Sequence, residues 1–268
     1  MASAVREQGT RARADLLTTD GTITLPREMR TLTIAARFRG PPTSANGGYF
    51  AGSVASLAAQ TVTVRLLKPP LLDREFAVEE LEGGSLRVLD GAEPVGEARP
   101  AALELDVRSA PDYLEAVKAS RDYAGFRYHR FPSCFVCGTQ RVRGDGMRVF
   151  AGPIADRGVV AAPWVPDVSL DAGDGKVRAE FMSAALDCPG YYAVAPDDRM
   201  MLLAEFTAHL DRRVRVSESC TIVGWHIGSS GRKHEAGTAL FDGEGDLVGR
   251  ARALWIEPRA AVETAHAL

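Results

Sequence analysis

Two short stretches place residues capable of chemistry beside glycines at the start of an expected helix. Residues 46–48 read Asn-Gly-Gly ahead of a run of small apolar residues, and residues 187–190 read Asp-Cys-Pro-Gly. A helix N-terminus presents unpaired N–H groups and a partial positive charge, and glycine lets a ligand approach them. We therefore expect the N–H groups around Gly48 and Gly190 to be able to stabilise an oxyanion. Tight packing of a helix on a sheet also requires glycine, and that alternative stays open.

Asp187 is the candidate for acid–base or nucleophilic chemistry. A carboxylate can activate a water molecule or attack a carbonyl carbon directly. At the start of a helix it is also a good N-cap, so capping alone is the competing interpretation. The first stretch offers no equivalent, because residues 44–60 contain no Asp, Glu or His. Asn46 can orient a substrate or a water molecule there, but it is not a base.

The four cysteines are Cys134, Cys137, Cys188 and Cys220. The C-x-x-C spacing of residues 134–137 is compatible with zinc or redox chemistry, but a zinc ion would require two more ligands. No second C-x-x-C or C-x-x-H pair is present, so we expect two reduced thiols in a turn, no metal and no cofactor. Cys188 at a helix start is a further, weaker candidate for a nucleophile, since no His base accompanies it.

The composition indicates an ordinary globular chain. Its 268 residues are 46% hydrophobic, and the net charge of −3 with a pI near 6.0 gives no reason to expect a nucleic-acid partner. No apolar run is long enough to span a membrane, and the N-terminus lacks the apolar region of a secretory signal. We expect a cytoplasmic protein whose residues 1–20 form a loosely ordered lead-in.

The chain repeats itself, which predicts two similar halves. LDGAEPVGEAR (89–99) and FDGEGDLVGRAR (241–252) share an Asp-Gly turn signal followed by Val-Gly-x-Ala-Arg. Each follows a β-rich run and a single helix, expected at 46–60 and 187–196, with an amphipathic connector helix inside 110–128. This order predicts an α+β protein with domains at 20–125 and 126–268, whose strands form one continuous or face-packed antiparallel surface about a pseudo-two-fold axis.

These segments resemble those of a known superfamily. CFVCGTQRVRGDGMRVF (134–150) is similar to an opening found in many hotdog-fold acyl-CoA thioesterase-like proteins. NGGYFAG (46–52) resembles the His-Gly-Gly helix start of phenylacetate-type thioesterases, with Asn46 in place of His. VRLLKPPLLDREF (64–76) resembles the strand-Pro-strand element of that superfamily. Over roughly residues 22–258 the chain resembles the double-hotdog form, which implies two antiparallel sheets, each wrapping a central helix.

The resemblance also implies a function. It suggests hydrolysis of an acyl-CoA or acyl-carrier-protein thioester, with Asp187 placed as in the hydroxybenzoyl-CoA thioesterase type, and a homo-oligomer. Expected substrate contacts are Gly47, the aromatic side chains of Tyr49 and Tyr191, and two cations for coenzyme A phosphates, Arg65 and Lys68. Alternatives are a binding protein that cleaves nothing, favoured by the acid-free first helix, and a hydratase or dehydratase, for which no Asp–His pair is evident.

Overall fold

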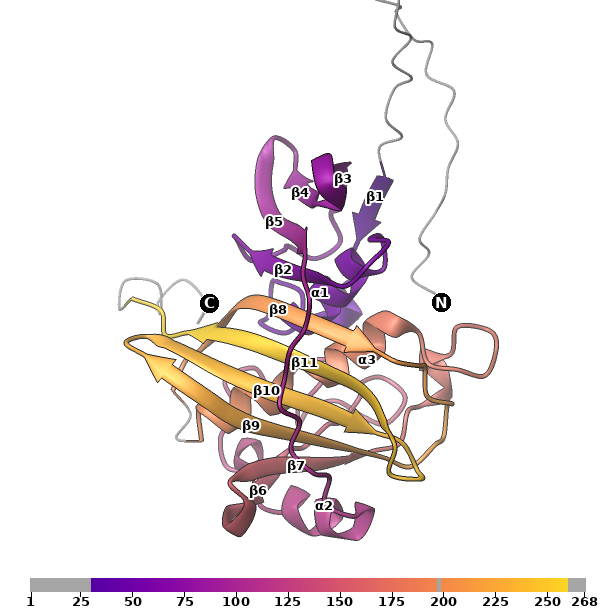
Figure 1. Ribbon diagram of the computed structural model, residues 1–268, viewed down its shortest axis with the longest axis vertical. Coiled ribbons are helices and arrows are strands. Elements are labelled where there is room, and N and C mark those ends of the chain that lie inside the picture. The colour runs from indigo at the N-terminus through magenta and orange to yellow at the C-terminus, as the bar shows by residue number, and fades with distance from the viewer. Residues whose placement is uncertain (1–29, 197–198, 260–268) are drawn as a thin grey trace, which may run out of the picture.

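The computed structural model describes residues 30–196 and 199–259, in which eleven strands form one antiparallel sheet (Figure 1). Its strand order is β1-β3-β4-β5-β2-β8-β11-β10-β9-β7-β6. In chain order the strands are β1 (Arg30–Thr33), β2 (Val62–Leu66), β3 (Glu75–Glu80), β4 (Leu86–Asp90), β5 (Glu93–Pro100), β6 (Gly152–Ile154), β7 (Val159–Trp164), β8 (Leu202–Leu210), β9 (Cys220–Ser230), β10 (Lys233–Phe241) and β11 (Leu247–Ile256).

Four α-helices accompany the sheet. They are α1 (Gly47–Ala55), α2 (Tyr113–Ser120), α3 (Ala179–Ala185) and α4 (Cys188–Val194). Single 3-10 turns lie at Ala36–Phe38, Glu82–Gly84, Ala124–Phe126, Ala155–Arg157 and Val168–Leu170. None of the helices in the described ranges is long and apolar enough to cross a membrane. The lead-in predicted for residues 1–20 and the outer limits of the two predicted domains lie outside these ranges.

The strand order confirms the predicted α+β repeat. Each half has a strand, then a helical segment, then four strands along the chain. The first half consists of β1, α1 and β2–β5, and the second contains β7, α3–α4 and β8–β11. The order β1-β3-β4-β5-β2 of the first half returns reversed as β8-β11-β10-β9-β7 in the second. Both Asp-Gly segments form the expected hairpins, β4–β5 and β10–β11. The boundary between the domains near residue 125 stays a prediction.

The expectation of two separate sheets is not met, because β2 and β8 pair at the centre. Thr63 lies opposite Thr207, Val64 opposite Phe206, and Arg65 opposite Glu205. Each of these strands would otherwise end its half-sheet with unpaired N–H and C=O groups. Pairing them antiparallel satisfies those groups and joins the two half-sheets into one.

Helix α1 begins as predicted but ends at Ala55 rather than at residue 60. The second helix differs more, because two helices replace the one expected at 187–196. Helix α3 was not foreseen, and residues 186–187 separate it from α4. Its start carries no recognisable signal: the N-cap residue Arg178 makes no side-chain capping bond. Glu180 lies in α3 and pairs with Arg178.

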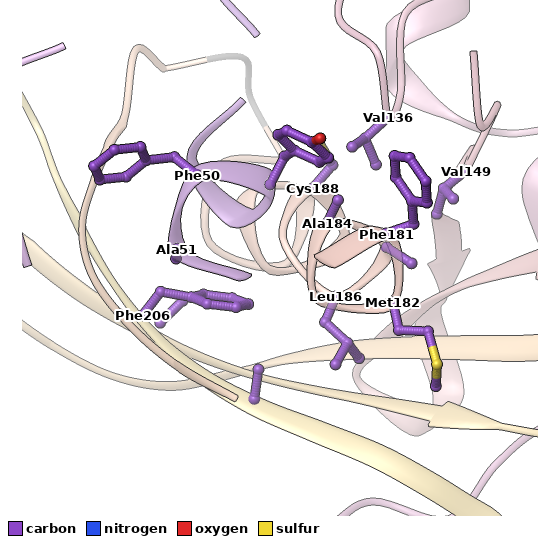
Figure 2. Packing of buried hydrophobic residues seen from close by; sticks show 14 of the residues in the cluster. Phe50, Ala51, Val136, Val149, Phe181, Met182, Ala184, Leu186, Cys188 and Phe206 are labelled. Carbon is purple, nitrogen blue, oxygen red and sulfur yellow. The ribbon is translucent and has the colours of Figure 1, made fainter. Parts of the chain in front are cut away.

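Helices α1 and α3 pack directly on each other, and two glycines of α1 make this possible. A Cβ atom on Gly48 would lie 2.4 Å from the Cβ of Asp187, and one on Gly52 would lie 2.6 Å from the Cβ of Ser183 and 3.0 Å from the Cα of Glu180. Such distances exclude a side chain unless the helices separate. Figure 2 shows the surrounding buried cluster, with Phe181 on α3 among its members. The glycines thus serve helix–helix packing, whereas helix–sheet packing was the alternative expected.

The face of the sheet opposite these helices is crossed by the extended segment 101–112, which runs to α2 (Figure 1). Leu105 and Val107 of this segment pack on a second apolar cluster that includes Trp225 and Phe241. The connector helix predicted inside 110–128 is confirmed as α2, whose N-cap Asp112 accepts the Glu115 N–H at 2.7 Å.

Candidate active site

The candidate site forms where the N-terminus of α1 meets the residue that follows α3. Asn46 is the N-cap of α1, and its Oδ1 accepts the Tyr49 N–H at 2.9 Å. Its Nδ2 donates to Asp187 Oδ2 at 2.7 Å, and the Gly48 N–H donates to the same oxygen at 2.9 Å. The two stretches singled out in the sequence, 141 residues apart, therefore build one site from both halves of the chain.

Asp187 does not cap its own helix, so the capping interpretation is wrong. Its side chain makes no capping bond to α4 and instead accepts the Gly48 N–H of α1 and the side-chain amide of Asn46. The residue is 2% exposed, and Oδ1 is buried without a hydrogen-bond partner. Burial raises the pKa of Asp187 to about 7, with a smaller push from Cys134, against the opposing hydrogen bonds from Gly48 and Asn46. A carboxylate whose pKa lies near neutral pH is suited to act as a general base.

Three thiols adjoin this carboxylate. The sulfurs of Cys134, Cys137 and Cys188 all lie within 4.8 Å of one another, and the Cys134–Cys188 pair is 3.9 Å apart. Asn46 Nδ2 lies 3.8 Å from the Cys188 sulfur and 4.0 Å from that of Cys134. The expectation of a metal-free turn assumed only two ligands. The structure corrects that count, because the backbone brings Cys188 to the turn.

A cavity of about 320 Å³ opens beside these groups, and it is lined mainly by apolar atoms. Asn46, Asp187 and the three clustered cysteines form one part of its wall. The apolar part comes from the loop after β2, the start of β8 and the end of β11: Leu66, Leu67, Pro69, Pro70, Met201, Leu202, Leu203, Ala204, Trp255 and Ile256. Apolar walls with a few convergent polar groups are typical of small-molecule sites.

Of the expected substrate contacts, Gly47, Tyr191 and Lys68 lie at this cavity. The Tyr191 hydroxyl donates to the Arg199 carbonyl at 2.8 Å. Lys68 is exposed and pairs with Glu93 at 2.5 Å, an interaction that holds the pKa of Glu93 below its usual value.

Tyr49 and Arg65 are not among the residues that line the cavity. Tyr49 is 2% exposed and stacks on Phe38, with ring centroids 4.4 Å apart, so it belongs to the core. Arg65 is exposed on β2, where the buried residues Val62 and Val64 mark the opposite face of the strand. A role for either residue in contacting a substrate in this cavity is therefore not supported.

The expected oxyanion donors are already engaged. The Gly48 N–H is bound to Asp187, and the Gly190 N–H donates to the Asp187 carbonyl at 3.0 Å. Gly190 instead allows α4 to approach the sheet, since an added Cβ would lie 3.3 Å from Ala236. Gly47 is different: it lines the cavity, and its N–H has no hydrogen-bond partner within residues 30–196 and 199–259.

Sequence reasoning missed the cysteine cluster and most of the apolar wall. The C-x-x-C spacing was a visible signal for the turn, but nothing marked Cys188 as its third member. His129 and Tyr192 also line the cavity. His129 Nδ1 accepts the Phe131 N–H at 3.0 Å, which leaves Nε2 to donate to the Cys137 carbonyl at 3.0 Å.

Comparison of the sequence with protein-family models and with curated proteins finds no match. Solved structures do match. An acyl-CoA thioesterase II of Mycobacterium marinum is 11% identical, with a TM-score of 0.56, over 87% of this chain and 94% of that one. A tesB protein of Mycobacterium avium subs paratuberculosis is 14% identical, with a TM-score of 0.57, over 86% and 93%.

A third match is a conserved protein of unknown function with a hot dog fold from Alicyclobacillus acidocaldarius. It is 12% identical, with a TM-score of 0.53, over 88% of this chain and 95% of that one. The resemblance stated from the sequence is confirmed at the level of fold: the chain shares the hot dog fold of these structures over 86–88% of its length.

Proposed function

We propose that the protein hydrolyses an acyl thioester, with Asp187 as general base. One observation carries the proposal: a buried carboxylate has one oxygen fixed by Asn46 and Gly48 while the other is unpartnered, at the wall of an apolar cavity. Fixing one oxygen orients the other, which is what a general base requires. The thioesterase names of structural neighbours are consistent with this chemistry.

In the proposed reaction, Asp187 Oδ1 takes a proton from a water molecule whose oxygen bonds to the thioester carbonyl carbon. The Gly47 N–H, at the positive end of α1, is the donor we assign to the resulting oxyanion. The C–S bond then breaks, and the leaving thiolate receives the proton from Asp187. The products are a carboxylic acid and a thiol, and the Asp187 carboxylate is restored.

The cavity indicates the acyl group. Its volume of about 320 Å³ and its apolar lining suit a short or medium hydrocarbon or aromatic acyl group rather than a polar one. Lys68 and Arg130 are the Lys and Arg residues among those that line the cavity, and Lys68 is the one we assign to a phosphate of coenzyme A or of a carrier's prosthetic group. Leu203 lies against Gly47, since a Cβ atom added to Gly47 would lie 2.7 Å from Leu203 Cδ2. We therefore expect Leu203→Ala to shift the preferred acyl group towards larger ones.

The proposal is tested by thiol release from a panel of acyl-CoAs. Asp187→Asn should lower turnover by roughly 10²-fold or more. Its amide oxygen can still accept both N–H groups, so binding of a thioether analogue should persist. Asp211→Asn is the matched control, since Asp211 is exposed, pairs with Arg250 and is not among the cavity residues. A parent rate in the Asp187 variant would eliminate the carboxylate as the base.

Direct attack by Asp187 is a variant of the same proposal that one labelling experiment separates. Repeated turnover in heavy-oxygen water would leave label in the Asp187 carboxylate only if that carboxylate had formed an anhydride with the acyl group. Unlabelled Asp187 after many turnovers supports the general-base route.

A second candidate is a protein that binds acyl thioesters without cleaving them. Two observations favour it: Asp187 is only 2% exposed, and α1 carries no acid. Tight binding of acyl-CoA by the parent chain, with no thiol released from any member of the panel, would establish this alternative and overturn hydrolysis.

A further inference from the structure

Three of the four cysteines in the chain come together at one point. Cys134 and Cys137 lie in the turn before β6, and Cys188 is the first residue of α4. All three are buried, and all three line the cavity. The fourth, Cys220, lies apart at the start of β9 and serves as an internal comparison.

The turn that carries two of these thiols is held in a defined shape. The Gly138 N–H donates to the Cys134 carbonyl at 2.9 Å, and a Cβ on Gly138 would lie 2.4 Å from that oxygen, so only glycine fits. The Tyr123 hydroxyl and His129 Nε2 both reach the Cys137 carbonyl at 3.0 Å. The thiols are thus positioned by their surroundings before any ligand arrives.

Hydrogen-bond donors are directed at the Cys134 sulfur, as a thiolate requires. The Cys188 thiol lies 3.9 Å from this sulfur, and Asn46 Nδ2 donates to it at 4.0 Å. Ordinary core packing, in which a buried cysteine behaves as a small apolar residue, does not require such donors.

A second, independent feature also points to a missing ligand. Asp187 Oδ1 is buried without a partner, in the residue next to Cys188. Asn46 Nδ2 faces both this carboxylate and two of the sulfurs. The cluster therefore combines soft ligands, donors that support negative charge and an unsatisfied acceptor.

We propose that Cys134, Cys137 and Cys188 bind one zinc ion. A tetrahedral zinc with Zn–S bonds of about 2.3 Å places its sulfurs about 3.8 Å apart, close to the observed 3.9 Å between Cys134 and Cys188. Three thiolates select a soft or borderline ion such as zinc. Because the three residues line the cavity, the fourth position faces it and is available to water or to a ligand group.

Metal analysis of the full-length chain, purified without a metal-affinity tag, tests the site. We expect about one zinc per chain, and cobalt substitution should give thiolate-to-metal charge-transfer absorption with the visible bands of a tetrahedral ion. Cys188→Ser should weaken zinc binding, measured by competition with a chromophoric chelator, by more than about 100-fold, the upper end of what losing a second-shell partner costs. Cys220→Ser should bind zinc like the parent.

Three results would overturn the proposal. The first is a reduced, folded parent chain that neither contains zinc nor takes it up on titration. The second is a metal-free chain lighter by two hydrogen atoms, with a peptide map that places the resulting disulfide between two of these three cysteines. The third is Cys188→Ser with unchanged metal content and an unchanged cobalt spectrum.

If that variant fails to fold, the cobalt spectrum of the parent chain decides the matter. Zinc content is measured without any thioester, so this result and the outcome of the thiol-release assay are separate.

Discussion

Substituting Gly48 by alanine tests the contact on which the site depends. The added Cβ would lie 2.4 Å from the Cβ of Asp187 and 3.0 Å from the Ser183 carbonyl, both on or next to a rigid helix. Overpacking of this kind costs about 1–3 kcal/mol, and moving Asp187 away weakens a charged hydrogen bond worth about 1.5–3 kcal/mol. Alanine recovers about 1 kcal/mol of helix propensity. We expect a net loss of about 2–4 kcal/mol in the free energy of unfolding.

Urea denaturation measures that loss directly, and the melting temperature should fall by roughly 5–15 °C. Gly228→Ala is the matched control, because a Cβ added there would meet no atom within 4 Å and the φ of Gly228 is not positive. That substitution should change stability by less than about 0.5 kcal/mol. If Gly48→Ala were as stable as Gly228→Ala and equally active, Gly48 would not be held against Asp187 and the geometry of the site would be wrong.

Asn46→Ala should lower the free energy of unfolding by about 1 kcal/mol, because α1 loses its cap. Asn46→Asp keeps the cap but should also be destabilised in urea, because it places a second carboxylate against Asp187. An Asp variant as stable as the parent would contradict the contact. The Thr63 and Thr207 hydroxyls lie 2.7 Å apart, so Thr207→Val should lower stability in the same assay by about 1 kcal/mol, because the Thr63 hydroxyl loses its partner. Replacing both threonines by valine should recover most of this stability. Cys220, whose pKa burial raises to about 12, should resist maleimide labelling of the folded chain at neutral pH, as read by mass spectrometry. Calorimetry should find one thioether analogue bound per chain; two would contradict a single composite site.

The repeat, its hairpins and its single connector helix were predictable because each depends on local signals. Asp-Gly turns between alternating runs identified the hairpins, and the amphipathic run within residues 110–128 identified α2. Asn46 and Asp187 could be selected as candidates because each precedes a glycine at a helix start. Helix α3 carries no such signal: its N-cap is Arg178, and its residues from Glu180 to Ala185 are all buried, so no polar face alternates with an apolar one.

The contacts between the halves could not be predicted, because they depend on how two distant segments pack. Nothing in the residues around Gly48 shows that its N–H is directed at Asp187 rather than at a ligand. The same limit hid the cysteine cluster: Cys188 joins the turn only because α4 follows α3 and the loop before β6 folds over the start of α1. There the Phe135 N–H donates to the Arg39 carbonyl at 2.8 Å.

The packing of α1 on α3 also explains why two similar halves lead to one site. The helices run antiparallel, since Gly48 contacts Asp187 while Gly52 contacts Glu180. At one end of the pair, the N–H groups of α1 meet a carboxylate. At the other end, the start of α3 meets the part of α1 that contains Ser53, whose hydroxyl donates to the Tyr49 carbonyl at 2.8 Å. Because α1 supplies no acid there, the repeated fold keeps its symmetry while the proposed chemistry is confined to the end that holds Asp187 and the three thiols.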